Sequence, residues 1–339
     1  MLFRSDSLSA GDEPPFCGSG RKKQQIQRKK VTIWKHVKGK KNRDGALNRY
    51  EKIRMDKDAI PKAERGNRSG GKKRMNRTIR VSAAGDILIM KRLLPGYQDV
   101  LPIREFLMRG EVRMANLETT ISDGSCYASA YSGGTWLTAD AKCLEDTLRY
   151  GFNFLGISNN HTMDYSYEGL ASTISELKKK DVAYAGAGKN LYEASRPAIL
   201  DTTAGQIAVI DICSTFENAA RAGSQTERQP GRPGLNPLRF SEKYTITEKH
   251  AQDLAKIAEV TGINGLRDLH RQEGFIAPLS EGVMEFGGKM FEISKDGTEG
   301  RSSSPNPIDV KRTVDAIREA KMTCEAVLVM VHSHEIRKD

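Results

Sequence analysis

Short apolar runs alternate with amphipathic stretches from residue 79 onward, and this order predicts strands that alternate with helices. Aliphatic runs bounded by polar turn residues are typical of buried strands. We expect strands at 79–84, 112–117, 152–157, 182–185, 197–201, 206–212 and 326–331. Apolar positions at helical spacing predict helices at 101–109, 139–150, 166–180, 253–260, 265–271 and 309–322. Such alternation predicts an α/β fold built of layers.

Two local signals refine this pattern. Thr138 is a favourable N-cap residue, so we expect it to begin the helix at 139–150. Residues 203–205 form a short turn between two strands, which predicts a hairpin from 197–201 and 206–212.

Two parts of the chain depart from the pattern. Residues 214–305 are less regular and include a linker rich in Ser, Gly and Pro at 294–306, and we interpret them as an insertion over one rim of the sheet. Residues 1–78 have no sustained period and few aliphatic side chains, so we expect a disordered basic leader before a domain at 79–339. The stretch before Met75 needs purine-rich codons, as a translated ribosome-binding site would, so a natural start at Met75 is a further hypothesis.

The charge of the chain is unevenly distributed. Residues 1–80 hold 24 Lys and Arg against 8 Asp and Glu, whereas residues 81–339 hold 30 against 35. The net charge of +11 therefore belongs to the leader, and a role in nucleic-acid binding would depend on the leader alone. We do not expect nucleic acid as a partner of the folded part.

Cysteine use and hydropathy bound the cellular context. The chain has 5 cysteines, an odd number, and none at the spacing of a zinc knuckle, so we expect free thiols in a reducing compartment. No apolar run reaches the length of a transmembrane helix, and no secretory signal opens the chain. Taken literally, the sequence predicts a cytoplasmic protein.

Polar residues that can bind a metal follow several of the expected strands. In open α/β sheets, ligands bind just outside the carboxyl ends of the strands. The residues in this position are Asp86, Glu118, Asn160, His161, His332 and His334. Carboxylate, carboxamide and imidazole together suit Mn²⁺, Zn²⁺ or Fe²⁺. Two such ions can generate a hydroxide at neutral pH, while His161 donates a proton to a leaving group. For each residue alone, an ordinary turn or surface position is the alternative.

Several motifs in this order resemble the CapA family. The specific ones are Asn116-Leu117-Glu118 and Ser158-Asn159-Asn160-His161, and Gly85-Asp86 and His332-Ser333-His334 accompany them. These are poly-γ-glutamate capsule-synthesis proteins, which are similar to calcineurin-like metallophosphoesterases. The resemblance covers residues 79 to 336 and implies a layered metallophosphoesterase-like sandwich with two divalent metal ions.

The resemblance also implies roles for individual residues. Asp86 and Glu118 would hold or bridge the two ions, Asn160 and His332 would be further ligands, and His161 would be the proton donor. His334 and Glu335 would line the site.

The chain departs from the family pattern at its C-terminal end. The family continues to a later Gly-His-x-x-His segment, and this sequence stops before one. We therefore expect an incomplete sandwich that lacks late metal ligands and binds metal more weakly. The sequence leaves open whether this polypeptide is itself an enzyme.

Two functions follow from the resemblance. The first is a metal-dependent, phosphoesterase-like hydrolase in the synthesis of poly-γ-glutamate or another anionic polymer. The alternative is a non-catalytic component that binds polymer or a capsule-synthase complex. Family resemblance implies association with a membrane. Trp136, Arg221 and Arg232 are candidates for lining the substrate, although a loop contact or a solvated surface explains them equally well.

Overall fold

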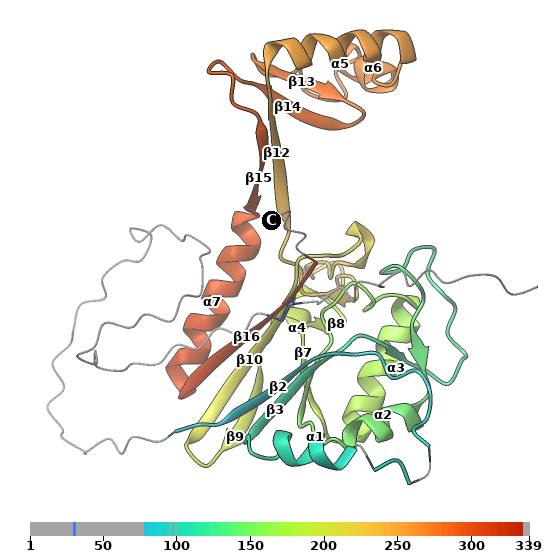
Figure 1. Ribbon diagram of the computed structural model, residues 1–339, viewed down its shortest axis with the longest axis vertical. Coiled ribbons are helices and arrows are strands. Elements are labelled where there is room, and N and C mark those ends of the chain that lie inside the picture. Colours follow the sequence, from blue (N-terminus) through green and yellow to red (C-terminus); the bar gives the residue numbers. More distant parts are fainter. Residues whose placement is uncertain (1–29, 32–77, 95, 99, 335–339) are drawn as a thin grey trace, which may run out of the picture.

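Two β-sheets that lie face to face form the centre of the molecule (Figure 1). The structure is a computed structural model that describes residues 30–31, 78–94, 96–98 and 100–334. The first sheet has the order β2-β3-β6-β7, and all of its strands are parallel. Its strands are β2 (Val81–Ile87), β3 (Val112–Leu117), β6 (Phe154–Gly156) and β7 (Ala183–Ala185).

The second sheet has the order β1-β16-β10-β9. Its strands are β1 (Lys30–Val31), β16 (Ala326–Ser333), β10 (Gly205–Cys213) and β9 (Ala198–Thr202). β9 and β10 pair antiparallel with Thr202 opposite Gly205, so the predicted hairpin is confirmed. β10 and β16 are parallel, although more than a hundred residues separate them in the chain. Residues 1–29 and 32–77 of the predicted leader lie outside the described residues.

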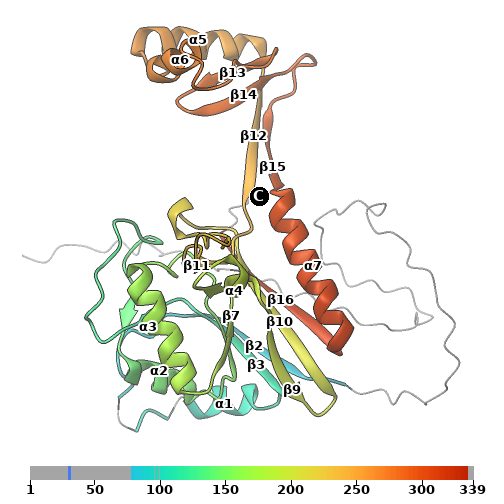
Figure 2. The same cartoon turned by 180° about the vertical axis from the view of Figure 1, so that it is seen from behind.

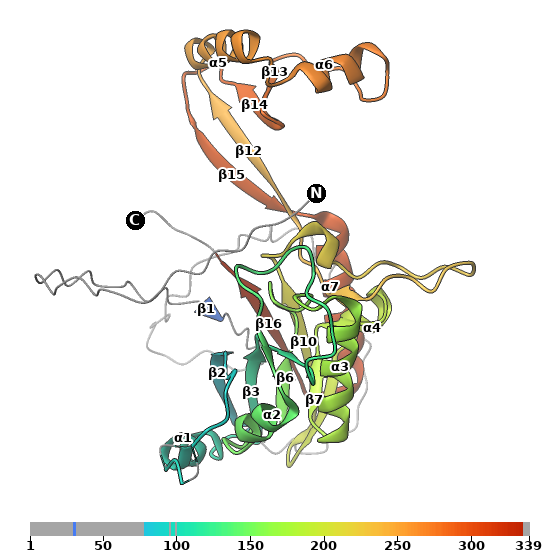
Figure 3. The same cartoon turned by 90° about the vertical axis from the view of Figure 1, so that its right-hand side faces the viewer.

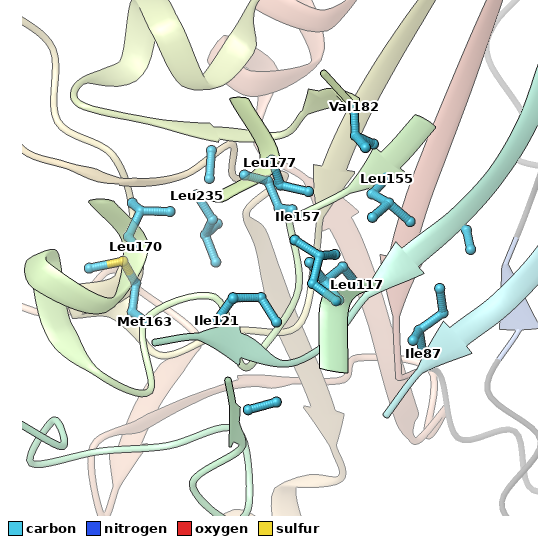
Figure 4. Close-up of a cluster of buried hydrophobic side chains, with 14 of the residues drawn as sticks. Ile87, Leu117, Ile121, Leu155, Ile157, Met163, Leu170, Leu177, Val182 and Leu235 are labelled. Atoms are coloured by element: carbon cyan, nitrogen blue, oxygen red, sulfur yellow. The ribbon is translucent and has the colours of Figure 1, made fainter. Parts of the chain in front are cut away.

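Apolar side chains fill the space between the two sheets and also cover the outer face of each sheet. Val112, Met114 and Phe154 of the first sheet form one buried cluster with side chains of β9, β10 and β16. The outer face of the first sheet packs against α2 (Ala141–Leu148) and α3 (Ser166–Lys179), as Figure 4 shows for Leu155 and Leu177. α7 (Pro307–Thr323) covers the second sheet, and α1 (Val100–Leu107) precedes β3. The predicted α/β sandwich is confirmed.

The start of α2 differs from the prediction. The N-cap is Asp140, whose Oδ1 accepts hydrogen bonds from the backbone N–H groups of Lys142 (2.7 Å) and Cys143 (3.0 Å). The predicted N-cap, Thr138, is wrong. It lies in β5 (Thr138–Ala139), which pairs with β4 (Thr120–Ile121), and this pairing keeps Thr138 in an extended conformation.

The region predicted as one insertion consists of two different parts. Residues 214–239 follow β10 and include the 3₁₀ turn Asn218–Ala220 and β11 (Gly234–Leu235), which pairs with β8 (Ala187–Gly188). The backbone of Asn236 bonds to Gly186 and to Cys213, so this part lies against the carboxyl ends of β7 and β10. The short helix α4 (Leu191–Ser195) follows β8.

Residues 240–305 form the second part, which we call the arm. Figures 1, 2 and 3 show β12 (Phe240–Ile246) and β15 (Gly300–Pro305) running away from the sandwich. At the far end are α5 (Glu248–Thr261), α6 (Gly265–Gln272), β13 (Val283–Phe286) and β14 (Lys289–Ile293). The linker predicted at 294–306 is wrong for residues 300–305. Their serines carry no strand signal of their own, and antiparallel pairing with β12 makes them a strand.

Two further findings bear on the predicted context. Among the described residues, no helix is both long and apolar enough to cross a bilayer. The four described cysteines, Cys126, Cys143, Cys213 and Cys324, are free thiols, as predicted.

Candidate metal centre

The strand ends of both sheets meet at one edge of the sandwich. Asp86 lies near the end of β2, Glu118 follows β3, and Asn160 and His161 follow β6. Parallel pairing of β2, β3 and β6 places these three ends side by side. His332, near the end of β16, comes from the second sheet and lies opposite Cys213 of β10.

The imidazole of His332 is the centre of this cluster. Its Nε2 atom lies 2.6 Å from Oδ1 of Asn160, 3.1 Å from Nε2 of His334 and 3.5 Å from Oε1 of Glu118. Its Nδ1 atom lies 3.6 Å from Oδ1 of Asp86. The structure therefore brings together all four residues predicted as metal ligands, and it adds His334 to them.

The donor atoms of this cluster fit a transition-metal ion. Ligating atoms of Glu118, His332 and His334 all lie within 4.8 Å of one another. Ligands at about 2.0 Å from a tetrahedral ion are about 3.3 Å apart, which is close to the separations around Nε2 of His332. Two imidazoles, a carboxylate and an amide oxygen are a donor set for Zn²⁺, Mn²⁺ or Fe²⁺.

The burial of the cluster favours a cation. Glu118 is 0% exposed and His332 is 4% exposed, while His334 lies at the surface. A buried carboxylate is stable when it is ion-paired, well hydrogen-bonded or bound to a metal. The cluster thus combines an enclosed side, formed by Glu118 and His332, with an open side at His334.

Asn116 connects the candidate ligands and was not among the predicted site residues. Its Nδ2 donates to Oδ1 of Asp86 (2.8 Å) and lies 3.2 Å from Nδ1 of His332. Its Oδ1 accepts a hydrogen bond from Nδ2 of Asn159 (3.0 Å). The available signal was a carboxamide within the otherwise apolar end of the strand at 112–117.

The predicted proton donor, His161, is paired with a buried carboxylate. Nδ1 of His161 lies 2.8 Å from Oδ2 of Asp164, and both side chains are buried. Asp164 also accepts hydrogen bonds from the backbone N–H groups of Gly133 (3.2 Å) and Leu137 (2.8 Å). This pairing fixes the orientation of the imidazole through its Nδ1 atom.

A second buried carboxyl group supports the loop that carries Asn160 and His161. Oδ2 of Asp211, in β10, accepts a hydrogen bond from the backbone N–H of Ser158 (2.8 Å). Burial raises the pKa of Asp211 well above its usual value. Asp211 was also missed, because it stands inside an apolar run that reads as an ordinary core strand.

The residues predicted to line the substrate have their hydrogen bonds within their own segments. Nε1 of Trp136 donates to the carbonyl of Ser129, Nε of Arg221 to that of Asn218, and Nε of Arg232 to that of Arg221. The hydrogen bonds of these three side chains do not reach the cluster around His332. Glu335 lies outside the described residues.

Comparison with known proteins identifies the family. The model of the family described as bacterial capsule synthesis protein PGA_cap matches residues 80–338. This chain belongs to the PGA_cap family. Membership confirms the resemblance that Asn116-Leu117-Glu118 and Asn159-Asn160-His161 indicated.

Curated relatives of the PGA_cap chain are distant and longer. An uncharacterized protein of Sinorhizobium fredii is 25% identical over 260 residues, which are 75% of this chain and 53% of that protein. The capsule biosynthesis protein CapA of Bacillus anthracis is 26% identical over 174 residues, 49% of this chain and 41% of CapA. A probable polyglutamine synthesis accessory protein of Mycobacterium tuberculosis is 26% identical over 212 residues, which are 60% of this chain and 52% of that protein. The chain thus spans about half the length of these relatives.

Proposed function

We propose that this protein is a metal-dependent, phosphoesterase-like hydrolase that acts in the synthesis of a capsule polymer. One observation carries the proposal. The ligating atoms of Glu118, Asn160 and His334 surround Nε2 of His332, and the His161–Asp164 pair follows Asn160 on the same loop. A metal site next to an oriented proton donor is what hydrolysis of a phosphoester requires.

The ligands divide into two groups on the two sides of the His332 ring. Glu118, Asn160, His332 and His334 would hold one ion, and Asp86 with Glu118 would provide the carboxylates for the second ion of the predicted pair. A bound Zn²⁺, Mn²⁺ or Fe²⁺ would lower the pKa of water and polarise a phosphoryl oxygen.

The acid–base work falls to His161. Asp164 holds Nδ1 of the imidazole, so the proton on Nε2 is the one that is transferred to the leaving oxygen. Asp164 therefore acts through His161 and does not itself contact substrate.

The proposed substrate is an anionic polymer or one of its precursors. Two relatives are named for capsule biosynthesis and polyglutamine synthesis, which supports poly-γ-glutamate or a capsule-synthase complex as the partner. Arg221 and Arg232, in the segment against the carboxyl ends of β7 and β10, are the proposed contacts for its carboxylates.

Metal content and hydrolysis test this function separately. The purified protein is loaded with Mn²⁺ or Zn²⁺, dialysed, and analysed for bound metal and for cleavage of an aryl phosphate ester. We expect His332→Ala to lose bound metal. We expect His161→Asn to keep the metal and lose about 10²–10⁴-fold in rate.

The control is His250→Ala, because His250 lies on the arm at the surface. Wild-type protein that is folded and binds no divalent metal would contradict the proposal. Metal binding without hydrolysis of any phosphoester would instead support a non-catalytic, polymer-binding component.

A further inference from the structure

The loop of residues 122–137, which joins β4 to β5, passes directly beside the proposed metal ligand Asn160. The carbonyl oxygen of Gly133 accepts a hydrogen bond from Nδ2 of Asn160, at 2.8 Å. A carboxamide has one donor end and one acceptor end, and its oxygen is the end that binds a metal. With Nδ2 held by Gly133, Oδ1 of Asn160 faces Nε2 of His332 at 2.6 Å.

This approach is so close that no side chain fits at position 133. A Cβ atom added to Gly133 would lie 2.3 Å from Nδ2, 2.7 Å from the backbone oxygen and 2.8 Å from the carbonyl carbon of Asn160. The last two atoms belong to the backbone and cannot rotate away. The φ angle of Gly133 is not positive, so other residues could adopt its backbone conformation. Glycine is needed at position 133 because the backbone of Asn160 lies so close.

Gly133 is also linked to the proposed proton donor, His161, through Asp164. The backbone N–H of Gly133 donates to Oδ1 of Asp164 (3.2 Å), and Oδ2 of Asp164 binds Nδ1 of His161 (2.8 Å). The carbonyl of Gly133 thus orients a metal ligand, while its N–H supports the carboxylate that orients the acid. Metal binding and proton donation therefore both depend on Gly133, although the loop of residues 122–137 supplies none of the proposed ligands.

We propose that Gly133 is a positioning residue that turns the carboxamide oxygen of Asn160 toward the metal. The inference rests on the proposed metal site, and it adds a determinant outside the ligand set. It predicts that any side chain at position 133 displaces Asn160 and weakens metal binding mainly by moving the Asn160 carboxamide.

A double-mutant cycle in the full chain tests this coupling. Wild type, Gly133→Ala, Asn160→Ala and the double variant are titrated with Mn²⁺ or Zn²⁺ alone, with a chelator dye as competitor. We expect Gly133→Ala to weaken binding by about 10- to 100-fold, as loss of an outer contact to a ligand does. In the Asn160→Ala background the same substitution should have a clearly smaller effect on metal affinity, because the carboxamide is gone and only the backbone of residue 160 still meets the added Cβ.

Gly300→Ala is the matched control. A Cβ atom at Gly300 meets nothing within 4 Å, and Gly300 has no positive φ, so metal affinity should stay at the wild-type level. Wild-type binding with unchanged affinity in Gly133→Ala would overturn the inference and leave the proposed function standing. Equal losses in both backgrounds would also overturn it. Failure of the wild type to bind metal would overturn both.

A crystal structure of the metal-loaded wild type tests the same point if Gly133→Ala does not fold. We expect Oδ1 of Asn160 on the metal and Nδ2 within hydrogen-bond distance of the Gly133 carbonyl. A carboxamide turned the other way, or a Gly133 carbonyl out of reach, would refute the proposal.

Discussion

At the scale of single residues, carboxamides organise this site as much as the charged groups do. Asn160 presents its oxygen to His332, and Asn116 links Asp86, His332 and Asn159. Asparagine offers a donor and an acceptor in fixed positions, so each one defines the orientation of its neighbours. The order of the site therefore depends on residues that carry no charge.

Replacing Asn116 by Leu should loosen this network. The substitution keeps a similar volume and leaves the buried Nδ2 of Asn159 without its bond to Asn116, so we expect a loss of about 1–3 kcal/mol in the free energy of unfolding. Metal affinity should fall as well, because Asp86 and His332 lose a shared contact. Urea unfolding and metal titration measure the two effects. Asn218→Leu, at an exposed position, serves as control, and equal stability of the two variants would refute this role.

At the scale of elements, the residues before a helix determine where that helix begins. α2 begins at Asp140, which accepts two backbone hydrogen bonds, whereas the neighbouring Thr138 is in a strand. We expect Asp140→Ala to destabilise the protein by about 1 kcal/mol, a common effect of losing an N-cap. Thr138→Ala should stay within about 0.5 kcal/mol of wild type. Thermal unfolding of the two variants compares these positions, and a larger effect at Thr138 would contradict the assignment.

The base of the arm is held by an ion-pair cluster at the start of α7. The buried carboxylate of Asp309 accepts hydrogen bonds from Nε (2.7 Å) and Nη2 (2.9 Å) of Arg239 and from Nη1 of Arg312 (2.7 Å). Arg239 precedes β12 and Asp309 follows β15, so the cluster joins the two points where the chain leaves and re-enters the sandwich. Burial alone would raise the pKa of Asp309, but the bonds from Arg239 and Arg312 lower it to about 2.

This cluster should stabilise the protein in a defined pH range. A folded-state pKa below the usual 3.8 stabilises the fold above that pH, and the stabilisation is lost as pH falls toward about 2. We expect Asp309→Asn to cost about 1–3 kcal/mol near neutral pH, since it leaves two half-buried guanidinium groups without their carboxylate. The difference from wild type should shrink in acid. Denaturant unfolding across this range measures it, and a difference that is independent of pH would show that Asp309 is not ionised.

At the scale of the whole molecule, the sandwich and the arm differ in how they are built. The sandwich has buried apolar clusters on both faces of its sheets, whereas the buried residues of the arm are Ala251 and Glu285. Glu285 pairs with Arg267 and Arg271, while Val260 is 88% exposed. The arm thus depends on strand pairing and ion pairs and contributes no core to the sandwich.

Removal of the arm should therefore leave the sandwich folded. Phe240 and Pro305 lie opposite each other, so residues 241–304 can be replaced by an Asn-Gly turn without moving the strand ends. We expect the shortened chain to keep its metal affinity and a cooperative thermal transition. Unfolding of the shortened protein, or loss of metal binding, would mean that the arm supports the site.

Much of this architecture was accessible from local pattern. The strands at 112–117 and 326–331 and the helix at 166–180 were predicted close to their observed bounds, because burial on one or both faces leaves a period along the chain. The strand at 300–305 was missed because its pairing with β12, and not its serines, makes it a strand. Thr138 was misjudged for a related reason, since its pairing with Thr120 outweighs its capping propensity.

The order of apolar and polar residues along the chain predicts which polar side chains end the buried strands, and parallel strands present those ends at a common edge. How these side chains meet is settled only in the folded molecule. Asn160 and His332 are 172 residues apart. Asn160 follows a strand of the first sheet and His332 lies in a strand of the second, so their contact depends on how the sheets pack. The approach of Gly133 to Asn160 and the position of Asn116 between Asp86 and His332 arise in the same way. These contacts join segments distant in the chain, and no local period records them.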